Sequence, residues 1–558
     1  MRFSTGYMIW GCFLVSVLFA AVPPVSAPVD WVMSGFAKKG NLSPHSLGPW
    51  ECDLSFSNVC ISDTSSGHDQ GEVDIEASPC EDGRLVAVWH DFYYYADYVY
   101  AINFDYALTT DGGESWERQR LYHPRLVDSL YYLGDPAVAA DNSGNFYIAA
   151  LGFDYYFYES AVFVFVSRDS GRTFTELCTL ALDDPYEFFH DKEWIAADQS
   201  GAFPGNVYVV WQRFDTYNNS DIVFSRSTDY GATFEEPTVL DTTGENYYPG
   251  ISYCAVGPDG ELYVSWVVWD DSPPYYVKCV RSDDGGETFT EKHDVALAEI
   301  IAEPLGDFYR ANGFPVIAVD CSPTATRGNV YVVYASFEDS SRGADVFCVR
   351  STDGGESWSE PVLVNDVVEE NQFMPWVDVD EAGNVNVIFY DTRNNPYSSI
   401  CDVYFARSTD GGITFEPNIR VSSAGSDPDS QFMGDYINLD SSGGKLFAAW
   451  TDTRTGVEHI FVGIGEETAV SERKTPNVSR LISAYPNPFN ERCIIRLDDD
   501  LPYEEELEVL DISGRVVRRF EIKPRQSEVI IDGADMAPGV YFVHLSGSQQ
   551  VQRLLLVK

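Results

Sequence analysis

The sequence predicts an all-β protein: a seven-bladed β-propeller, with six blades as the alternative, followed by a small Ig-like β-sandwich. An eight-residue turn recurs six times along the chain, at intervals of roughly 60 residues, which indicates a repeat architecture. Short β-branched and aromatic runs precede each turn in the same order. The last eighty or so residues contain period-two runs without the turn, which is typical of a separate sandwich.

The recurring turn, named the box turn below, has the pattern S/T-x-D-x-G-x-S/T-aromatic. Its aspartate can accept hydrogen bonds from the backbone of its own turn, and its glycine allows a positive φ. Its last residue can pack against the neighbouring sheet. The six box turns are Thr109–Trp116, Ser167–Phe174, Ser227–Phe234, Ser282–Phe289, Ser351–Trp358 and Ser408–Phe415.

Each repeat unit contains four runs that predict four antiparallel strands, which is the composition of a propeller blade. Examples of the first three runs are Pro315–Asp320, Asn206–Trp211 and Asp221–Arg226, and the third run leads directly into a box turn. A short fourth run follows, as in Pro361–Val364. Seven first and second runs occur but only six box turns. Because an open ring leaves sheet edges unpaired, we expect Leu54–Ile61 to supply the missing outer strand.

The chain divides into five predicted segments. Residues 1–27 predict a signal peptide, with an apolar run and a small-residue cleavage site, and no later stretch predicts a transmembrane segment in the mature chain. Residues 28–71 form an N-terminal extension that we expect to supply the closing strand. Residues 72–464 form the propeller, 465–479 a polar linker, and 480–558 the second β domain.

Charge excludes some partners. The formal net charge is −51, and the acidic excess belongs to the repeat region. Such a surface repels nucleic acid and anionic membranes, so we expect no nucleic-acid partner. No cysteine or histidine spacing resembles a zinc site. We therefore expect no metal or cofactor; Ca²⁺ is chemically compatible with the acidity, but no loop has EF-hand spacing.

Topology predicts where chemistry would lie. If the box turns occupy one face, the loops that enter each first run and leave each second run occupy the other. Asp391-Thr-Arg393 and Asp452-Thr-Arg454 repeat one motif there. In one interpretation each aspartate fastens its own arginine locally. In the other, several guanidiniums converge near the ring axis and hold a ligand carboxylate by forked hydrogen bonds. The predicted ligand-binding residues are Arg213, Arg310, Arg393, Arg454, Asp391, Asp452 and Trp376.

The box turn resembles the Asp-box, or BNR repeat, of sialidases and related propellers, over roughly residues 72 to 465. The resemblance implies that the boxes lie between third and fourth strands, opposite any active site. It also implies structural roles for six aspartates: Asp111, Asp169, Asp229, Asp284, Asp353 and Asp410.

A retaining enzyme of the sialidase family uses a tyrosine nucleophile, a glutamate that activates it and an aspartate acid. The resemblance implies Tyr247, Tyr248 or Tyr436 as nucleophile, Glu193 as its partner, and Asp74, Asp91 or Asp135 as acid. The Arg-Ile-Pro signature of sialidases does not occur in this sequence.

The tail resembles the sorting domain of type IX secretion, which is related to an Ig-like module of flagellar hook-cap proteins. The matching segments are Tyr485–Asn490, Val509–Val517, Ala537–Tyr541 and Leu554–Lys558. The resemblance implies a Gram-negative bacterium, a protein that is secreted or held at the cell surface, and the type IX secretion machinery as a partner.

These observations favour a non-catalytic, sialidase-like propeller that binds glycans or cell-surface proteins. The first alternative is an exo-glycosidase of sialidase type, with a tyrosine nucleophile and an arginine clamp on a sugar carboxylate. The second is an endo-acting polysaccharide hydrolase with two carboxylates across a groove. Because propellers host many activities, the fold alone does not decide between them.

Overall fold

The computed structural model describes residues 54–65, 67–95, 98–121, 132–154, 159–182, 187–270, 274–301, 311–339, 343–396, 398–428, 433–467, 481–485, 487–497, 505–511, 515–523, 528–545 and 552–557. These ranges contain strands and turns but no helix. None of them therefore provides a helix able to cross a membrane. The chain divides into two compact units, Met1–Glu467 and Thr468–Lys558.

The described strands of the first unit fall into seven antiparallel groups of four. Five groups are separate four-stranded sheets. In four of them the strands pair in chain order from the first to the fourth, and in the fifth the N-terminal strand β1 (Leu54–Cys60) takes the place of the fourth strand. The other two form an eight-stranded sheet that is joined only by one parallel bridge, between Ile102 of β4 (Tyr98–Thr109) and Tyr132 of β6 (Tyr132–Ala140). The predicted all-β class is confirmed.

The first strands of the groups are β2 (Asp69–Ala77), β6 (Tyr132–Ala140), β10 (Phe188–Ala197), β14 (Tyr248–Val256), β18 (Val316–Val319), β22 (Gln372–Val379) and β26 (Asn438–Ser442). The second strands are β3 (Leu85–Tyr95), β7 (Phe146–Phe153), β11 (Val207–Asp215), β15 (Leu262–Trp269), β19 (Val330–Asp339), β23 (Val385–Asp391) and β27 (Lys445–Asp452).

The third strands are β4 (Tyr98–Thr109), β8 (Ser160–Ser167), β12 (Ser220–Ser227), β16 (Tyr275–Ser282), β20 (Gly343–Ser351), β24 (Asp402–Ser408) and β28 (His459–Glu467). The fourth strands are β5 (Glu117–Arg120), β9 (Glu176–Leu182), β13 (Thr238–Thr242), β17 (His293–Ala298), β21 (Val362–Leu363), β25 (Ile419–Arg420) and β1 (Leu54–Cys60). Strand β28 continues into the range 465–479 that the sequence predicts as a linker.

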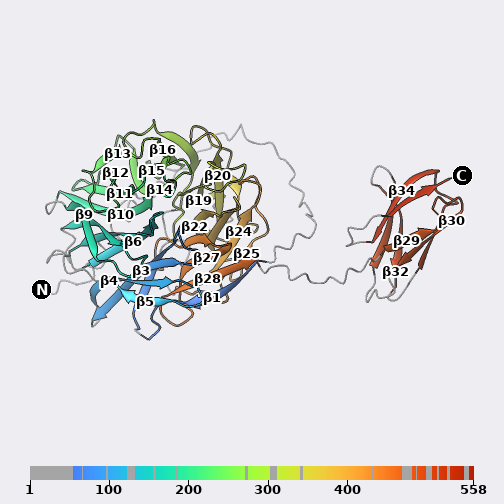
Figure 1. The fold of residues 1–558 in the computed structure, drawn as a ribbon, viewed down its shortest axis with the longest axis horizontal. Helices are drawn as coiled ribbons and strands as arrows, with labels where there is room; N and C mark the ends of the chain where they lie inside the picture. The colour runs from blue at the N-terminus through green and yellow to red at the C-terminus, as the bar shows by residue number, and fades with distance from the viewer. Residues whose placement is uncertain are drawn as a thin grey trace, which may run out of the picture. The chain divides into compact units, whose positions relative to one another are not determined.

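The groups form a closed ring. Each first strand contacts the first strand of the next group, and β26 contacts β2. Figure 1 shows the first strands β6, β10, β14 and β22 near the middle of the unit and the fourth strands at its periphery. Strand β1 pairs antiparallel with β28 along its whole length, from Leu54 opposite Glu467 to Cys60 opposite Phe461. The N-terminal strand thus supplies the fourth strand of the last group. We therefore propose seven blades.

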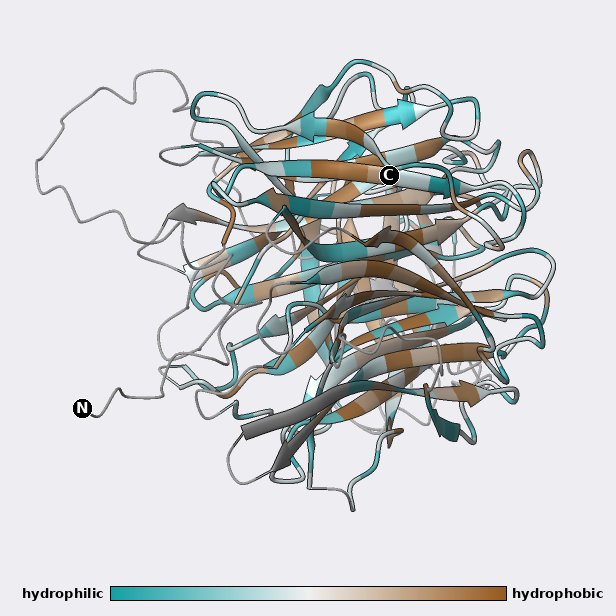
Figure 2. Cartoon of the chain, turned by 90° about the vertical axis from the view of Figure 1, so that its left-hand side faces the viewer, coloured by the Kyte–Doolittle hydropathy of each residue, from teal (hydrophilic) through white to brown (hydrophobic). Residues whose placement is uncertain are grey.

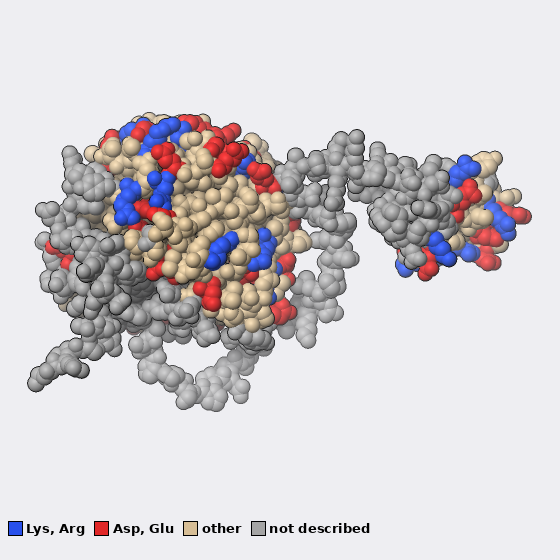
Figure 3. Space-filling view, turned by 90° about the horizontal axis from the view of Figure 1, so that it is seen from below, with Lys and Arg blue, Asp and Glu red and all other residues tan. Residues whose placement is uncertain are grey.

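Packing between groups buries the second strands on both faces, so these strands read as nearly continuous apolar runs. Trp89, Trp211, Trp266 and Trp450, each from a different second strand, are fully buried. Figure 2 shows the same pattern, with hydrophobic segments in the strands and hydrophilic residues in the connecting turns. On the side of the propeller unit seen in Figure 3, basic and acidic side chains lie interspersed around an uncharged area.

All six box turns connect a third strand to a fourth strand. In the first box turn, Asp111 Oδ1 accepts hydrogen bonds from Ser115 N (3.0 Å) and Thr109 Oγ1 (2.8 Å). The corresponding carboxylates of Asp169, Asp229, Asp284, Asp353 and Asp410 make the same pair of contacts. Each aspartate therefore holds its own turn.

The second unit is a β-sandwich of two antiparallel sheets. One contains β29 (Leu481–Tyr485), β30 (Arg492–Leu497) and β33 (Glu528–Asp532); the other contains β32 (Val516–Ile522), β31 (Glu505–Leu510), β34 (Gly539–Leu545) and β35 (Gln552–Leu556). Side chains from both sheets, including Cys493, Ile495, Leu507 and Val509, share one buried core.

Candidate functional site

Five of the first strands carry a bulge near the end where the chain enters the ring, and three of these, β2, β6 and β10, place charged residues there. The register of each strand with its neighbour shifts between Gly71 and Asp74, between Gly134 and Ala137, and between Asp191 and Trp194. The bulged residues Glu72, Asp135 and Lys192 have φ of 53°, 52° and 52°. Non-glycine residues rarely adopt positive φ, and bulges re-aim side chains at functional sites.

These three residues and Asp435 form a buried ion cluster, named the axial cluster below, that joins four groups of the ring. Lys192 Nζ lies 2.6 Å from Asp135 Oδ1, 2.6 Å from Asp435 Oδ2 and 3.3 Å from Glu72 Oε1. The Lys192 side chain is only 11% exposed and the three carboxylates are less exposed still. One ammonium thus faces three carboxylates, which leaves the axis negatively charged.

His90 fixes the position of Glu72. The backbone N–H of Asp135 donates to His90 Nε2 over 2.7 Å. His90 Nδ1 lies 3.0 Å from Glu72 Oε2. The imidazole of His90 and the ammonium of Lys192 thus contact different carboxylate oxygens of Glu72.

Two glutamates of this region have pKa values that move in opposite directions. Burial raises the pKa of Glu72, but the charge of Lys192 and the contact with His90 outweigh it, so this pKa falls to about 2. Burial, followed by the charge of Asp135, raises the pKa of Glu193 well above its usual value. Neither carboxyl oxygen of Glu193 has a hydrogen-bond partner in the described part of the chain, and Glu193 is 1% exposed. Glu193 is therefore stabilised as the neutral acid.

Next to the axial cluster lies an aromatic layer made of Trp194, Tyr253, Trp376 and Tyr436. The Trp194 ring lies 4.9 Å from that of Trp376, 5.0 Å from that of Tyr253 and 5.6 Å from that of Tyr436. Lys192 Nζ lies 5.9 Å from the centre of the Tyr436 ring. The layer closes the ring axis beneath the ion cluster, and Trp376, predicted as a ligand-binding residue, belongs to it.

Two of the tyrosines predicted as nucleophiles lie in different places. Tyr436 donates its hydroxyl proton to Pro136 O over 2.8 Å, and burial together with Glu72 and Asp135 raises its pKa well above the usual value. Tyr247 donates to Asp241 Oδ2 over 2.6 Å, and burial together with Asp241 raises its pKa also. Raised pKa values oppose the tyrosinate that a nucleophile requires.

The predicted acids Asp74 and Asp135 come from neighbouring first strands. Asp135 belongs to the axial cluster. Asp74 accepts hydrogen bonds from Val138 N (2.5 Å), Ile75 N (3.0 Å) and Asn438 Nδ2, and burial raises its pKa well above the usual value. These contacts tie β2 to β6 and β26. The structure thus brings Asp74, Asp135, Glu193 and Tyr436 together near the axis, whereas Tyr247 pairs with Asp241.

The predicted arginines of the described residues are each paired with a carboxylate of their own group. Arg213 Nη2 lies 2.6 Å from Asp221 Oδ2, Arg393 Nη2 lies 2.6 Å from Asp391 Oδ2, and Arg454 Nη2 lies 2.6 Å from Asp452 Oδ2. Arg310 lies outside the described residues. The local ion pair therefore accounts for both Asp-Thr-Arg motifs, and a convergent arginine clamp stays a prediction.

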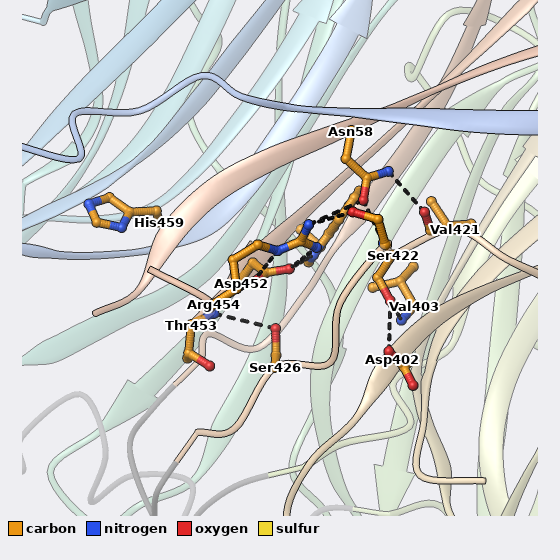
Figure 4. Close-up of polar contacts among 12 residues, drawn as sticks. Asn58, Asp402, Val403, Val421, Ser422, Ser426, Asp452, Thr453, Arg454 and His459 are labelled. Atoms are coloured by element: carbon orange, nitrogen blue, oxygen red, sulfur yellow. Dashed lines mark hydrogen bonds and ion pairs between the residues drawn. The ribbon is translucent and has the colours of Figure 1, made fainter. Parts of the chain in front are cut away.

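Each Asp-Thr-Arg motif also fastens one group to the preceding one, an arrangement named the clasp below. In Figure 4, Asn58 of β1 donates to Val421 O (2.9 Å), and Arg454 Nη1 reaches Asn58 Oδ1 (3.4 Å). Asn418 makes the equivalent contacts: it donates to Val364 O (3.1 Å) and accepts from Arg393 Nη2 (2.9 Å). Strand β1 therefore occupies in the last group the place that β25 has in the group before.

Lys192 and Glu72 lie near the starts of first strands, but no motif in the sequence predicts a role for either residue. One signal could have found the cluster. An acidic residue follows a glycine where three first strands begin, in Gly71-Glu72, Gly134-Asp135 and Gly434-Asp435. Gly434 has φ of 94°, and a Cβ there would lie 2.8 Å from Glu72 N, so the cluster requires this close approach.

One comparison identifies the tail. Residues 483–558 match the family described as "Secretion system C-terminal sorting domain". The chain thus carries a type IX sorting domain at its C-terminus, which confirms the predicted resemblance and indicates a secreted or cell-surface protein. No curated protein sequence matches the chain.

Solved structures resemble the propeller unit. Hadza microbial sialidase Hz136 is 14% identical and covers 73% of this chain and 68% of its own, with a TM-score of 0.41. The α-L-arabinofuranosidase Arb93A from Fusarium graminearum is 12% identical and covers 74% and 97%, with a TM-score of 0.43. A PL25 ulvan lyase is 13% identical and covers 73% and 95%, with a TM-score of 0.46. At these values the similarity assigns no activity to this chain.

Proposed function

We propose that this protein is an exported propeller that binds a glycan or protein ligand on the loop face, opposite the box turns, without transforming it. The observation that carries the proposal is the charge of the axial cluster. Lys192 is already held by three carboxylates, so the axis attracts neutral hydroxyl-rich or cationic groups and repels a sugar carboxylate. The high pKa values of Tyr247 and Tyr436 support the same proposal.

Binding is tested with the purified full-length protein on an array of neutral and anionic glycans. Tyr217 lies in the loop that leaves β11 and is 84% exposed, so it is available to stack on a sugar ring. We expect retention on neutral glycans, with affinity reduced about 2- to 10-fold by Tyr217→Ala. Tyr230, in a box turn on the opposite face, supplies the control: Tyr230→Ala should bind like the unaltered protein. Equal losses in both variants, or preference for sialylated glycans, would contradict the proposal.

Catalysis is tested separately with a fluorogenic sialoside. The expected result is no release of fluorophore above the buffer blank. Release that scales with protein concentration and disappears in Tyr436→Phe would establish the sialidase alternative instead.

A second candidate, the endo-acting polysaccharide hydrolase, is favoured by one specific observation. Glu193 has a raised pKa and Glu72 a lowered one on the same side of the ring, and an acid and a base with separated pKa values are typical of glycoside hydrolysis. This function requires that neutral polysaccharides become shorter on incubation with the protein. Glu193→Gln should then abolish the shortening while leaving the melting temperature at or above its original value.

A further inference from the structure

The ring has a hollow at the end of its axis opposite the axial cluster. This axial cavity has a volume of about 610 Å³, and residues of all seven first strands line it. Its rim is formed by the turns that follow the first strands, including Ser78, Pro258 and Ser322. Turns of this kind lie beside the box turns, since Gly112 N donates to Gly83 O and Tyr230 N to Gly205 O. The cavity therefore opens on the box face, away from the site proposed above.

The inner end of the axial cavity is aromatic. Trp194 and Trp376 of the aromatic layer line it, with ring centres 4.9 Å apart. The faces of indole rings attract cations that are placed over them. The two tryptophans that line the cavity are therefore candidates for contact with a cation.

The wall of the cavity is acidic. Glu76 of β2, Asp378 of β22 and Asp440 of β26 come from three different groups and line the same hollow. Arg327 is the one basic residue among the described lining residues, and its guanidinium is held at the rim by Pro258 O (3.1 Å) and Asp259 Oδ1 (2.9 Å). No basic side chain of the described lining therefore pairs with these three carboxylates.

The carboxylates are oriented by neutral donors and keep unused acceptor capacity. Asp440 accepts from Ala77 N (2.5 Å) and Ser441 N (2.7 Å), and Glu76 Oε1 accepts from Gln199 Nε2 (2.9 Å). Asp378 Oδ2 is buried and has no hydrogen-bond partner in the described part of the chain. A buried carboxyl oxygen without a partner costs free energy unless a ligand satisfies it.

We propose that the axial cavity binds an alkylammonium ligand, whose ammonium group is attracted by the carboxylates of Glu76, Asp378 and Asp440 while its alkyl chain lies on Trp194 and Trp376. The cavity volume lies within the range of small-molecule sites and is far larger than a single ion. In the described part of the chain no three His, Cys, Asp or Glu side chains are grouped closely enough to hold a metal ion. An organic cation satisfies both the carboxylates and the aromatic end.

The test is isothermal titration of the full-length protein with 1,4-diaminobutane. We expect saturable binding of the diamine and none of 1,4-butanediol, which has the same length and no charge. Asp378→Asn and Glu76→Gln should each weaken diamine binding by tenfold or more. Asp294→Asn is the matched control, because Asp294 is an exposed carboxylate paired with Lys278 outside the cavity, and this variant should bind normally.

Removing repulsion among Glu76, Asp378 and Asp440 should not unfold the protein, so the melting temperatures of Asp378→Asn and Glu76→Gln should equal or exceed the original. Three results would overturn the proposal: no diamine binding, equal binding of the diol, or equal affinities in Asp378→Asn and Asp294→Asn. The last result would show that the diamine follows only the overall negative charge. Because the cavity lies on the box face, loss of this binding leaves the glycan-array result for the loop face unchanged, so the two proposals fail independently.

Discussion

At the scale of single residues, Lys192 is the residue on which the centre of the ring depends. Its ammonium is the basic group that pairs with three buried carboxylates from three other groups, and its own backbone has a positive φ. Residues in strained conformations persist only where the surroundings over-determine them. At Glu72, Asp135 and Lys192 the surroundings are ionic, since the ammonium of Lys192 contacts both carboxylates.

Replacing Lys192 by methionine should therefore destabilise the propeller unit strongly. The apolar side chain has a similar length but leaves Glu72, Asp135 and Asp435 without their cation, which costs about 3–5 kcal/mol for a buried pair. Urea unfolding followed by tryptophan fluorescence measures the change. Lys192→Arg keeps the charge and should recover most of the loss. A methionine variant as stable as the original would contradict an essential role for the axial cluster.

Asp440 should make stability depend on pH between about 4 and 6. Burial raises its pKa to about 6, although the amides of Ala77 and Ser441 oppose this shift. An acid whose pKa is higher in the folded state contributes stability below its unfolded pKa and loses it as pH rises through the folded value. Asp440→Asn should remove this loss, on the order of 2 kcal/mol between pH 4 and pH 7.

Parallel unfolding curves at these two pH values measure the effect for the original protein and the variant. The same difference between the two proteins at both pH values would show that Asp440 does not titrate in this window.

At the scale of elements, the clasp determines how neighbouring groups hold together. Arg393 and Arg454 perform the same task in successive groups, with buried Asp391 and Asp452 beneath them. The difference is that the clasp of Arg454 includes Asn58 of β1, the strand that comes from the other end of the propeller sequence. A motif that reads as a candidate ligand site is thus a connection between blades.

Arg454→Ala and Arg393→Ala should each destabilise the unit by about 2–4 kcal/mol, because each leaves a buried carboxylate without its cation. The two substitutions should loosen different strands. Amide hydrogen exchange in β1 should accelerate in Arg454→Ala and stay slow in Arg393→Ala. Arg118→Ala, which removes a half-exposed pair with Asp63, should change stability by less than about 1 kcal/mol. Equal acceleration of β1 in both clasp variants would contradict the assignment of Arg454 to closure.

At the scale of the whole molecule, the repeat made the fold predictable and the tertiary arrangement made the site hard to predict. Box turns and their preceding runs have local signatures, so the all-β class and the strand order could be read from sequence. The axial cluster joins residues as far apart as Glu72 and Asp435, which become neighbours only when the ring closes. Lys192 also lies in a bulge, and an insertion of this kind leaves no periodic signal. The opposite pKa shifts of Glu72 and Glu193 depend on burial, which the sequence does not contain.

Ring closure is the claim on which the placement of both proposed sites depends, and β1 completes the last group of the ring. Hydrogen exchange of the β1 amides, residues 54–60, tests it most directly. If β1 closes the ring, these amides are protected to the same degree as their partners in β28, within about tenfold in rate. Exchange of residues 54–60 at the rate of an unpaired chain, while β28 stays protected, would contradict it.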